Sequence, residues 1–86
     1  MNHFATPGFW YRYRQLPPEI QELADKNFEL LKSNPRHPSL RFKKAGNLWS
    51  VRVGLHHRAL AKERREGLTW FWIGRHREYE QVLKTN

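Results

Sequence analysis

Cysteine is absent from this 86-residue sequence. Disulfides, thiolate nucleophiles and cysteine-bound zinc or iron–sulfur clusters are therefore excluded. Long hydrophobic runs are lacking too, and no segment approaches the roughly 20 apolar residues that span a membrane. The first residues show neither the basic nor the apolar stretch of an export signal, so we expect a cytoplasmic protein with no membrane partner.

Acidic residues are scarce, with 8 Asp and Glu against 16 Lys and Arg, which gives a net charge of +8. The charge is also segregated. Residues 17–33 carry four acids and two bases, whereas residues 34–86 carry twelve bases and four acids. A coat that serves only solubility remains one explanation, but a segregated basic face is typical of proteins that meet a polyanion.

Hydrophobic residues make up 38% of the chain and aromatic residues 14%, which is enough for a compact core. No internal repeat or linker divides the sequence. We therefore expect a single domain over residues 1–86, with residues 1–8 as a flexible N-terminus.

Local patterns predict an α+β fold. Aromatic residues over 9–14 favour a short strand. Pro17 and Pro18 open a helix that extends to residue 33, and its apolar stripe is Ile20, Leu23, Ala24, Phe28 and Leu31. From Ser39 the period changes to two, which predicts strands over 39–43, 49–53, 58–62 and 68–73, followed by a short helix over 76–84. Short connections favour a curved, mostly antiparallel sheet of four or five strands with the N-terminal strand and helix packed on it.

The tryptophans allow two interpretations. Trp70 and Trp72 are two positions apart and should share one face of a central strand, and Trp49 lies in another strand. Exposed aromatic residues on a basic sheet can stack nucleic-acid bases. We favour a core position for Trp49 and for at least one of the other two.

No generic catalytic motif is present: no glycine-rich phosphate loop, no metal-spaced pair of histidines on a helix and no nucleophile elbow. His56, His57 and His76 are the only hint of a metal site. Neighbouring strand residues point to opposite sides, so we expect turn histidines, no metal and no cofactor.

A better-motivated cluster lies on the predicted strands. Arg52 and Arg58 flank a turn around residues 54–57 and should lie close together, with Lys43 one strand away. His76 and Tyr79 share a face of the last helix. Arginine and lysine stabilise phosphate charge, and histidine transfers protons near neutral pH, so this set of side chains suits RNA cleavage. The same pattern also has a purely structural explanation, in which the arginines are exposed strand residues, the histidine caps the helix and the tyrosine anchors it.

Five blocks of the sequence are informative together: residues 16–21 (LPPEIQ), 34–40 (NPRHPSL), 48–54 (LWSVRVG), 57–60 (HRAL) and 70–79 (WFWIGRHREY). In this order and spacing they resemble the RelE/ParE superfamily of toxins from bacterial type II toxin–antitoxin systems. The resemblance extends from about residue 9 to 83, and the last block is close to the Gly-x-His-x-Glu ending of YafQ-like ribonucleases.

The resemblance implies a compact ribonuclease-like fold and roles for individual residues. Arg52 and Arg58 match strand cations of the RNA-cleaving members, His76 and Tyr79 match the late histidine and aromatic residue, and His57 matches a further histidine of YafQ-like enzymes. A second strand lysine of the RelE type falls on Ser50, which carries no charge. We assign RNA binding to the neighbouring basic residues Arg41, Lys43, Lys44, Arg75 and Arg77.

The resemblance also implies partners. RNA-cleaving members act on mRNA at the ribosome, whereas the ParE branch inhibits DNA gyrase without cutting RNA. A metal-independent, ribosome-dependent mRNA endonuclease is the leading hypothesis. The alternatives are a gyrase inhibitor and an inactive basic relative. An acidic antitoxin is the expected partner in each toxin hypothesis, with a heterotetramer as one assembly to test.

Overall fold

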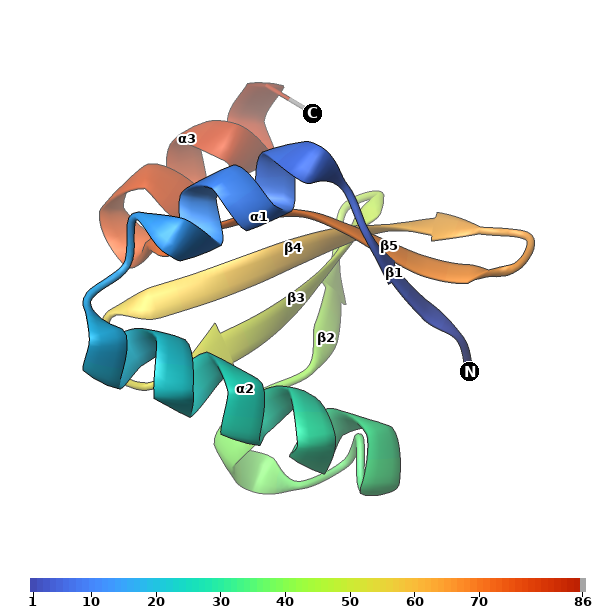
Figure 1. Ribbon diagram of the computed structural model, residues 1–86. Coiled ribbons are helices and arrows are strands. Elements are labelled where there is room, and N and C mark those ends of the chain that lie inside the picture. The colour runs from blue at the N-terminus through green and yellow to red at the C-terminus, as the bar shows by residue number, and fades with distance from the viewer. Residues whose placement is uncertain (86) are drawn as a thin grey trace.

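A computed structural model describes residues 1–85 as three helices and a five-stranded mixed sheet (Figure 1). In chain order the elements are β1 (His3–Ala5), α1 (Pro7–Arg14), α2 (Pro18–Ser33), the 3-10 turn η1 (Pro38–Leu40), β2 (Lys43–Ala45), β3 (Leu48–Val53), β4 (His57–Arg64), β5 (Gly67–Arg75) and α3 (His76–Thr85). The strand order is β1-β5-β4-β3-β2, with β1 parallel to β5 and the other neighbours antiparallel. The predicted α+β class is confirmed.

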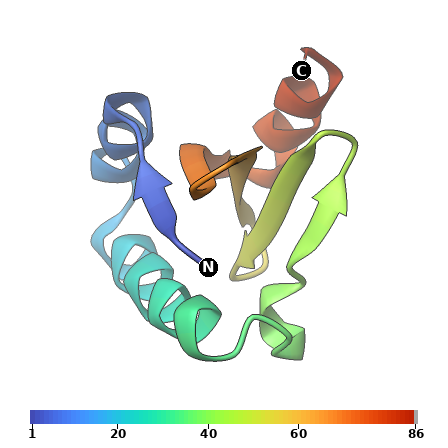
Figure 2. The same ribbon diagram turned by 90° about the vertical axis from the view of Figure 1, so that its right-hand side faces the viewer.

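The helices lie on both faces of the sheet. Figure 2 shows α1 and α2 on one side and α3 on the other. The larger core lies on the α1/α2 face, where buried residues of β3, β4 and β5 meet Leu16 and Leu31. A smaller cluster of Leu48, Leu60, Trp72 and Tyr79 lies under α3. Alternating strand residues therefore face two different environments, which we call the α1/α2 face and the α3 face.

The N-terminal segment differs from its prediction at two places. Residues 3–5, expected within a flexible terminus, pair with residues 68–70 of β5 as strand β1. The predicted strand over 9–14 is wrong, because this segment belongs to helix α1. Thr6 caps that helix by accepting a hydrogen bond from the Phe9 N–H at 3.1 Å, and Pro7 occupies the first turn. Capping and aromatic packing along one helix face outweigh the strand propensity of these residues.

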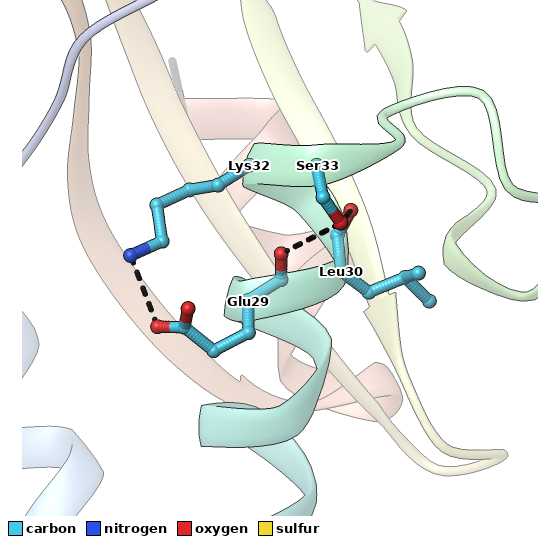
Figure 3. A network of polar contacts seen from close by, with 4 residues as sticks. All are labelled: Glu29, Leu30, Lys32 and Ser33. Carbon is cyan, nitrogen blue, oxygen red and sulfur yellow. Dashed lines mark hydrogen bonds and ion pairs between the residues drawn. The ribbon is translucent and has the colours of Figure 1, made fainter.

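Helix α2 has the predicted bounds within one residue. Leu31 of its apolar stripe is buried, whereas Phe28 is 39% exposed and forms no part of the fully buried core. At the C-terminal end, the Ser33 hydroxyl donates to the carbonyl oxygens of Glu29 and Leu30, and the Lys32 ammonium pairs with the Glu29 carboxylate at 3.0 Å (Figure 3). These contacts close the last turn before Pro35 stops the helix.

The segment that precedes the sheet also differs from its prediction. Residues 38–40 form η1 in place of the start of a strand, and β2 begins only at Lys43. Pro38 opens this turn, and the His37 Nδ1 accepts a hydrogen bond from the Ser39 N–H at 3.2 Å. The remaining three strands and α3 are confirmed, with shifts of one or two residues at their ends.

A β-bulge in β5 changes the expected places of the tryptophans. Leu60 opposes Trp72 and Ala61 opposes Trp70, so Phe71 has no partner of its own. The extra residue turns Trp70 toward the α1/α2 core and Trp72 toward α3. The prediction that these two side chains share a face is therefore wrong, although both are core residues. Trp49 packs half-buried against the α1/α2 core.

Candidate functional site

A pair of arginines forms the centre of the candidate site. Arg52 on β3 and Arg58 on β4 are directly opposed in the antiparallel ladder, so both side chains extend over the α3 face. Each guanidinium folds back on the main chain. Arg52 Nε donates to the Gly54 carbonyl at 2.9 Å, and Arg58 Nη1 donates to the His57 carbonyl at 2.8 Å. Both side chains are half-buried and keep donors free for an anion.

The pair has no internal counter-ion. Among residues 1–85, no carboxylate lies within ion-pair distance of Arg52 or Arg58. Burial lowers the pKa of Arg58, and the nearby charges of Arg52 and Arg41 lower it further, while Tyr79 acts in the opposite direction. Uncompensated like charges held this close are unfavourable in a structure without a ligand, and they favour a bound anion such as phosphate.

The imidazole of His76 lies at the start of α3, directly after β5. The main-chain N–H of His76 donates to the His56 carbonyl at 2.8 Å, and Gly74, two residues earlier, opposes Arg58. The imidazole ring stacks on Tyr79 with centroids 5.4 Å apart. Nε2 lies 3.5 Å from a Glu80 carboxylate oxygen, whereas the buried Nδ1 has no hydrogen-bond partner. Because Nδ1 is buried, Nε2 is the ring nitrogen that a ligand could reach for proton transfer.

Lys43 also belongs to this face. It opposes Ser50 across β2 and β3, and Ser50 is two residues from Arg52 on the same side of the strand. The serine itself is buried. Exposed Lys43 therefore lies opposite Ser50, the position at which a lysine of the RelE type is absent from this sequence.

The surroundings of Tyr79 do not suit a residue that stacks on a nucleic-acid base. It is 7% exposed, and one ring face is covered by His76. Its neighbours in the small core are Leu48, Leu60 and Trp72. The phenol ring therefore packs against the imidazole ring and can hold it in place.

Other predicted site residues lie elsewhere. His57 opposes Val53 and Arg75, so it lies on the α1/α2 face with Arg75 and is buried there. Burial lowers the pKa of His57, and Arg75 and His56 add to this effect. Lys44 opposes Trp49 on that same face and forms an exposed ion pair with Glu63 at 4.0 Å.

Arg41 and Arg77 lie at the border of the site. Arg41 follows η1 in the left-handed backbone region (φ 45°), and its charge is felt by Arg58. Arg77 is exposed near the start of α3. The structure therefore brings Arg52, Arg58, Lys43, His76 and Tyr79 together and separates His57, Lys44 and Arg75 from them.

One basic residue near this face, Arg12, was not predicted from the sequence. The guanidinium of Arg12, on α1, lies 5.3 Å from the ring centroid of Trp72. Its position depends on α1 being a helix, which the aromatic composition of residues 9–14 concealed. The only usable signal was Thr6-Pro7, a capping residue followed by proline.

The opposite face carries a groove of about 320 Å³ between α1, β1 and α2. Its walls are mainly apolar, and the aromatic residues Phe4, Trp10 and Phe28 remain 47%, 44% and 39% exposed. Within it, the His3 Nδ1 accepts a hydrogen bond from Trp70 Nε1 at 3.0 Å. Burial lowers the pKa of His3, followed by the charges of the N-terminus and Lys32. An apolar, partly open groove of this kind fits an apolar segment of a partner.

In residues 1–85 no three side chains of His, Asp or Glu are grouped as metal ligands. No described helix is long and apolar enough to cross a bilayer.

Comparison with known structures supports the fold. A chain of the RelB–RelE antitoxin–toxin complex from Methanococcus jannaschii matches with a TM-score of 0.70 and 16% identity over 92% of this chain and 96% of that one. A chain of the RelBE2 toxin–antitoxin complex from Mycobacterium tuberculosis matches with a TM-score of 0.64 and 18% identity, over 86% and 95% of the two chains. The isolated RelE toxin of E. coli matches with a TM-score of 0.62 and 12% identity, over 96% and 95%.

No curated protein sequence matches the chain significantly. The model of the ParE-like toxin domain matches residues 18–81, from the start of α2 into α3. That range includes the arginine pair, Lys43 and His76. On this match and the shared fold, the chain belongs to the ParE-like toxin domain family of the RelE/ParE superfamily.

Proposed function

We propose that this toxin domain is a metal-independent, ribosome-dependent mRNA endonuclease that inhibits translation. The observation that carries the proposal is the arginine pair, Arg52 and Arg58, which has no carboxylate partner among residues 1–85 and lies on the same face as the half-exposed imidazole of His76. RNA supplies both a phosphate for the guanidinium groups and a 2′-OH that can act as the nucleophile.

The proposed step is an internal displacement. The 2′-oxygen attacks the adjacent phosphorus, the bond to the 5′-oxygen breaks, and the products are a 2′,3′-cyclic phosphate and a 5′-hydroxyl. One proton leaves the 2′-OH and one reaches the departing 5′-oxygen. Charge on the phosphoryl oxygens increases in the transition state, which is where donors held in advance are most effective.

The residues divide these tasks. Arg52 and Arg58 bind the phosphoryl oxygens, and Lys43 supplies the cation that Ser50 does not. His76 transfers a proton, with Glu80 near its Nε2. Tyr79 holds the imidazole ring by stacking. His57 has no part in this step, because it is buried on the other face of the sheet.

The match to the ParE-like family model favours a second candidate, inhibition of DNA gyrase. In that case the basic α3 face contacts protein or DNA and needs no proton transfer. The two candidates differ in their dependence on His76, which only the nuclease requires.

We further propose that the toxin is held by an acidic antitoxin. Two of the structures with this fold are toxin–antitoxin complexes. The chain offers such a partner two surfaces, an apolar groove on the α1/α2 face and a basic α3 face. Because these surfaces lie on opposite faces of the sheet, one segment of the partner would place apolar side chains in the groove and a separate acidic segment would lie over the cations.

The test is induced expression in cells that lack the antitoxin, with protein synthesis, mRNA integrity and DNA supercoiling followed together. Early cleavage of translated mRNA with normal supercoiling supports the nuclease. Loss of supercoiling with intact mRNA supports gyrase inhibition, and unimpaired growth indicates an inactive relative.

A further inference from the structure

Helix α2 contacts the end of β3 at two points, one helical turn apart. The Asn27 side-chain amide donates to the Arg52 carbonyl at 3.1 Å. Leu23 packs against Gly54 so closely that a Cβ on this glycine would lie 2.8 Å from Leu23 Cδ2. The two residues are four apart and share one helix face. Together they clamp the three residues from Arg52 to Gly54.

The side chain of Arg52 depends on this clamped segment. Its Nε donates to the Gly54 carbonyl at 2.9 Å, so the direction of the guanidinium follows from where that carbonyl is held. Gly54 has a φ of +68°, a conformation that other residues adopt only with strain. The hydrogen bond to the Gly54 carbonyl therefore ties the position of the guanidinium to the main chain.

Asparagine is an unusual residue at position 27. It lies within α2, where asparagine is less favourable than alanine or leucine, and it is half-buried along the wall of the apolar groove. The hydrogen bond to the Arg52 carbonyl gives the amide a reason to be present.

We propose that Asn27 is a positioning residue, which fixes the guanidinium of Arg52 on the α3 face through the main chain of β3. The inference rests on the proposed function only in naming an RNA phosphate as the ligand of Arg52. It also makes α2 the link between the groove on one face and the arginine pair on the other.

Two variants test the role. Asn27→Ala removes the amide, and Asn27→Asp keeps the side-chain shape but removes the donor. The matched control is Gln21→Ala, because the Gln21 amide donates to the Leu16 carbonyl at the same 3.1 Å from the other end of α2. Each protein is made by cell-free synthesis, and its fold is verified from the amide NMR spectrum.

The first readout is hydrogen exchange of the Arg52 Nε–H group by NMR, which reports its bond to Gly54 directly. The second is affinity for a short 2′-O-methyl RNA, which cannot be cleaved by attack of the 2′-oxygen. Both Asn27 variants should exchange faster at Arg52 but not at Arg58, and they should bind the RNA roughly threefold to tenfold more weakly, the effect of one lost hydrogen bond. The Gln21→Ala protein should match the parent in both measurements, even if it melts earlier.

Unchanged exchange at Arg52 in both Asn27 variants overturns the proposal, whatever the affinity. Faster exchange at Arg52 without weaker RNA binding also overturns the proposal, provided that the Arg52→Ala protein binds the RNA more weakly than the parent. If Arg52→Ala leaves binding intact, the proposed function fails, and the positioning role is then decided by exchange alone.

Discussion

Arg52 and Arg58 oppose each other across β3 and β4, and in the described chain neither has a carboxylate partner. Directly opposed like charges destabilise a sheet by about 0.2–1 kcal/mol. The fold therefore tolerates a repulsion that a bound anion would relieve.

This repulsion predicts the effect of Arg58→Met, which removes the charge and keeps much of the apolar stem. We expect the variant to be as stable as the parent or up to about 1 kcal/mol more stable, since it loses an unfavourable pair. The measurement is urea unfolding at low and high salt. The gain should shrink as salt screens the parent's repulsion. A clear loss of stability at low salt would show that the arginine pair is held by favourable contacts instead.

Strand alternation gives a second prediction, on Lys43 and Lys44. These adjacent lysines face opposite sides of β2, with Lys43 on the α3 face. Lys43→Ala should weaken binding of a non-cleavable RNA and reduce its salt dependence by about one charge, whereas Lys44→Ala should have little effect. Binding titrations at several salt concentrations measure both quantities. Equal effects from the two variants would argue against an RNA site confined to the α3 face.

A third prediction concerns the core beneath α2. Leu31 is 3% exposed, whereas Phe28 is 39% exposed along the groove. Leu31→Ala should cost about 2–5 kcal/mol, and Phe28→Ala should cost clearly less, because much of its ring already contacts water. Chemical unfolding of both variants tests the order. A larger loss of stability for Phe28→Ala than for Leu31→Ala would contradict this order, because it would mean that the Phe28 ring is buried and the groove is closed in solution.

Buried His57 and half-buried His3 give the pH dependence of stability. Burial lowers the pKa of His57 and of His3 below the ordinary value of 6.5. The unfolded chain therefore takes up protons at a higher pH than the folded one. The stability that depends on these two neutral histidines is fully present above about pH 6.5, and it is lost as the pH falls toward their folded-state pKa values.

The corresponding measurement is the melting temperature between about pH 7.5 and about pH 5. The parent should melt progressively earlier as the pH falls, and His57→Gln should show a shallower decline, because one of the two titrating groups is gone. A decline of equal slope in both proteins would contradict the buried, neutral state of His57.

Much of the α3 face was predictable from the sequence because it depends on strand alternation and one short turn. Arg52 and Arg58 flank the turn at residues 54–57, and that spacing alone indicates that they are neighbours. The helix spacing of His76 and Tyr79 likewise predicted their contact. Helix α2 was clear from its proline start and apolar stripe.

The remaining features depend on contacts that no local pattern carries. The bulge at Phe71 places Trp70 and Trp72 on opposite faces, and nothing in an apolar run shows where the extra residue lies. Helix α1 is fixed by a cap and by packing against β5, which outweigh its aromatic composition. His57 was expected in a turn but starts β4, so it lies on the face opposite to Arg58.

The central claim is that the arginine pair and His76 cleave RNA, and the most direct measurement is cleavage of ribosome-bound mRNA in cells without antitoxin. Arg58→Ala should reduce cleavage about 100–1000-fold and His76→Ala about 100–10,000-fold. Arg64→Ala and Arg65→Ala serve as charge-matched controls at the exposed β4–β5 hairpin, and both should cleave like the parent. If the Arg58 and His76 variants cleave as fast as the parent, the proposed active site is contradicted. If none of these proteins cleaves mRNA while growth still stops and supercoiling falls, gyrase inhibition replaces it.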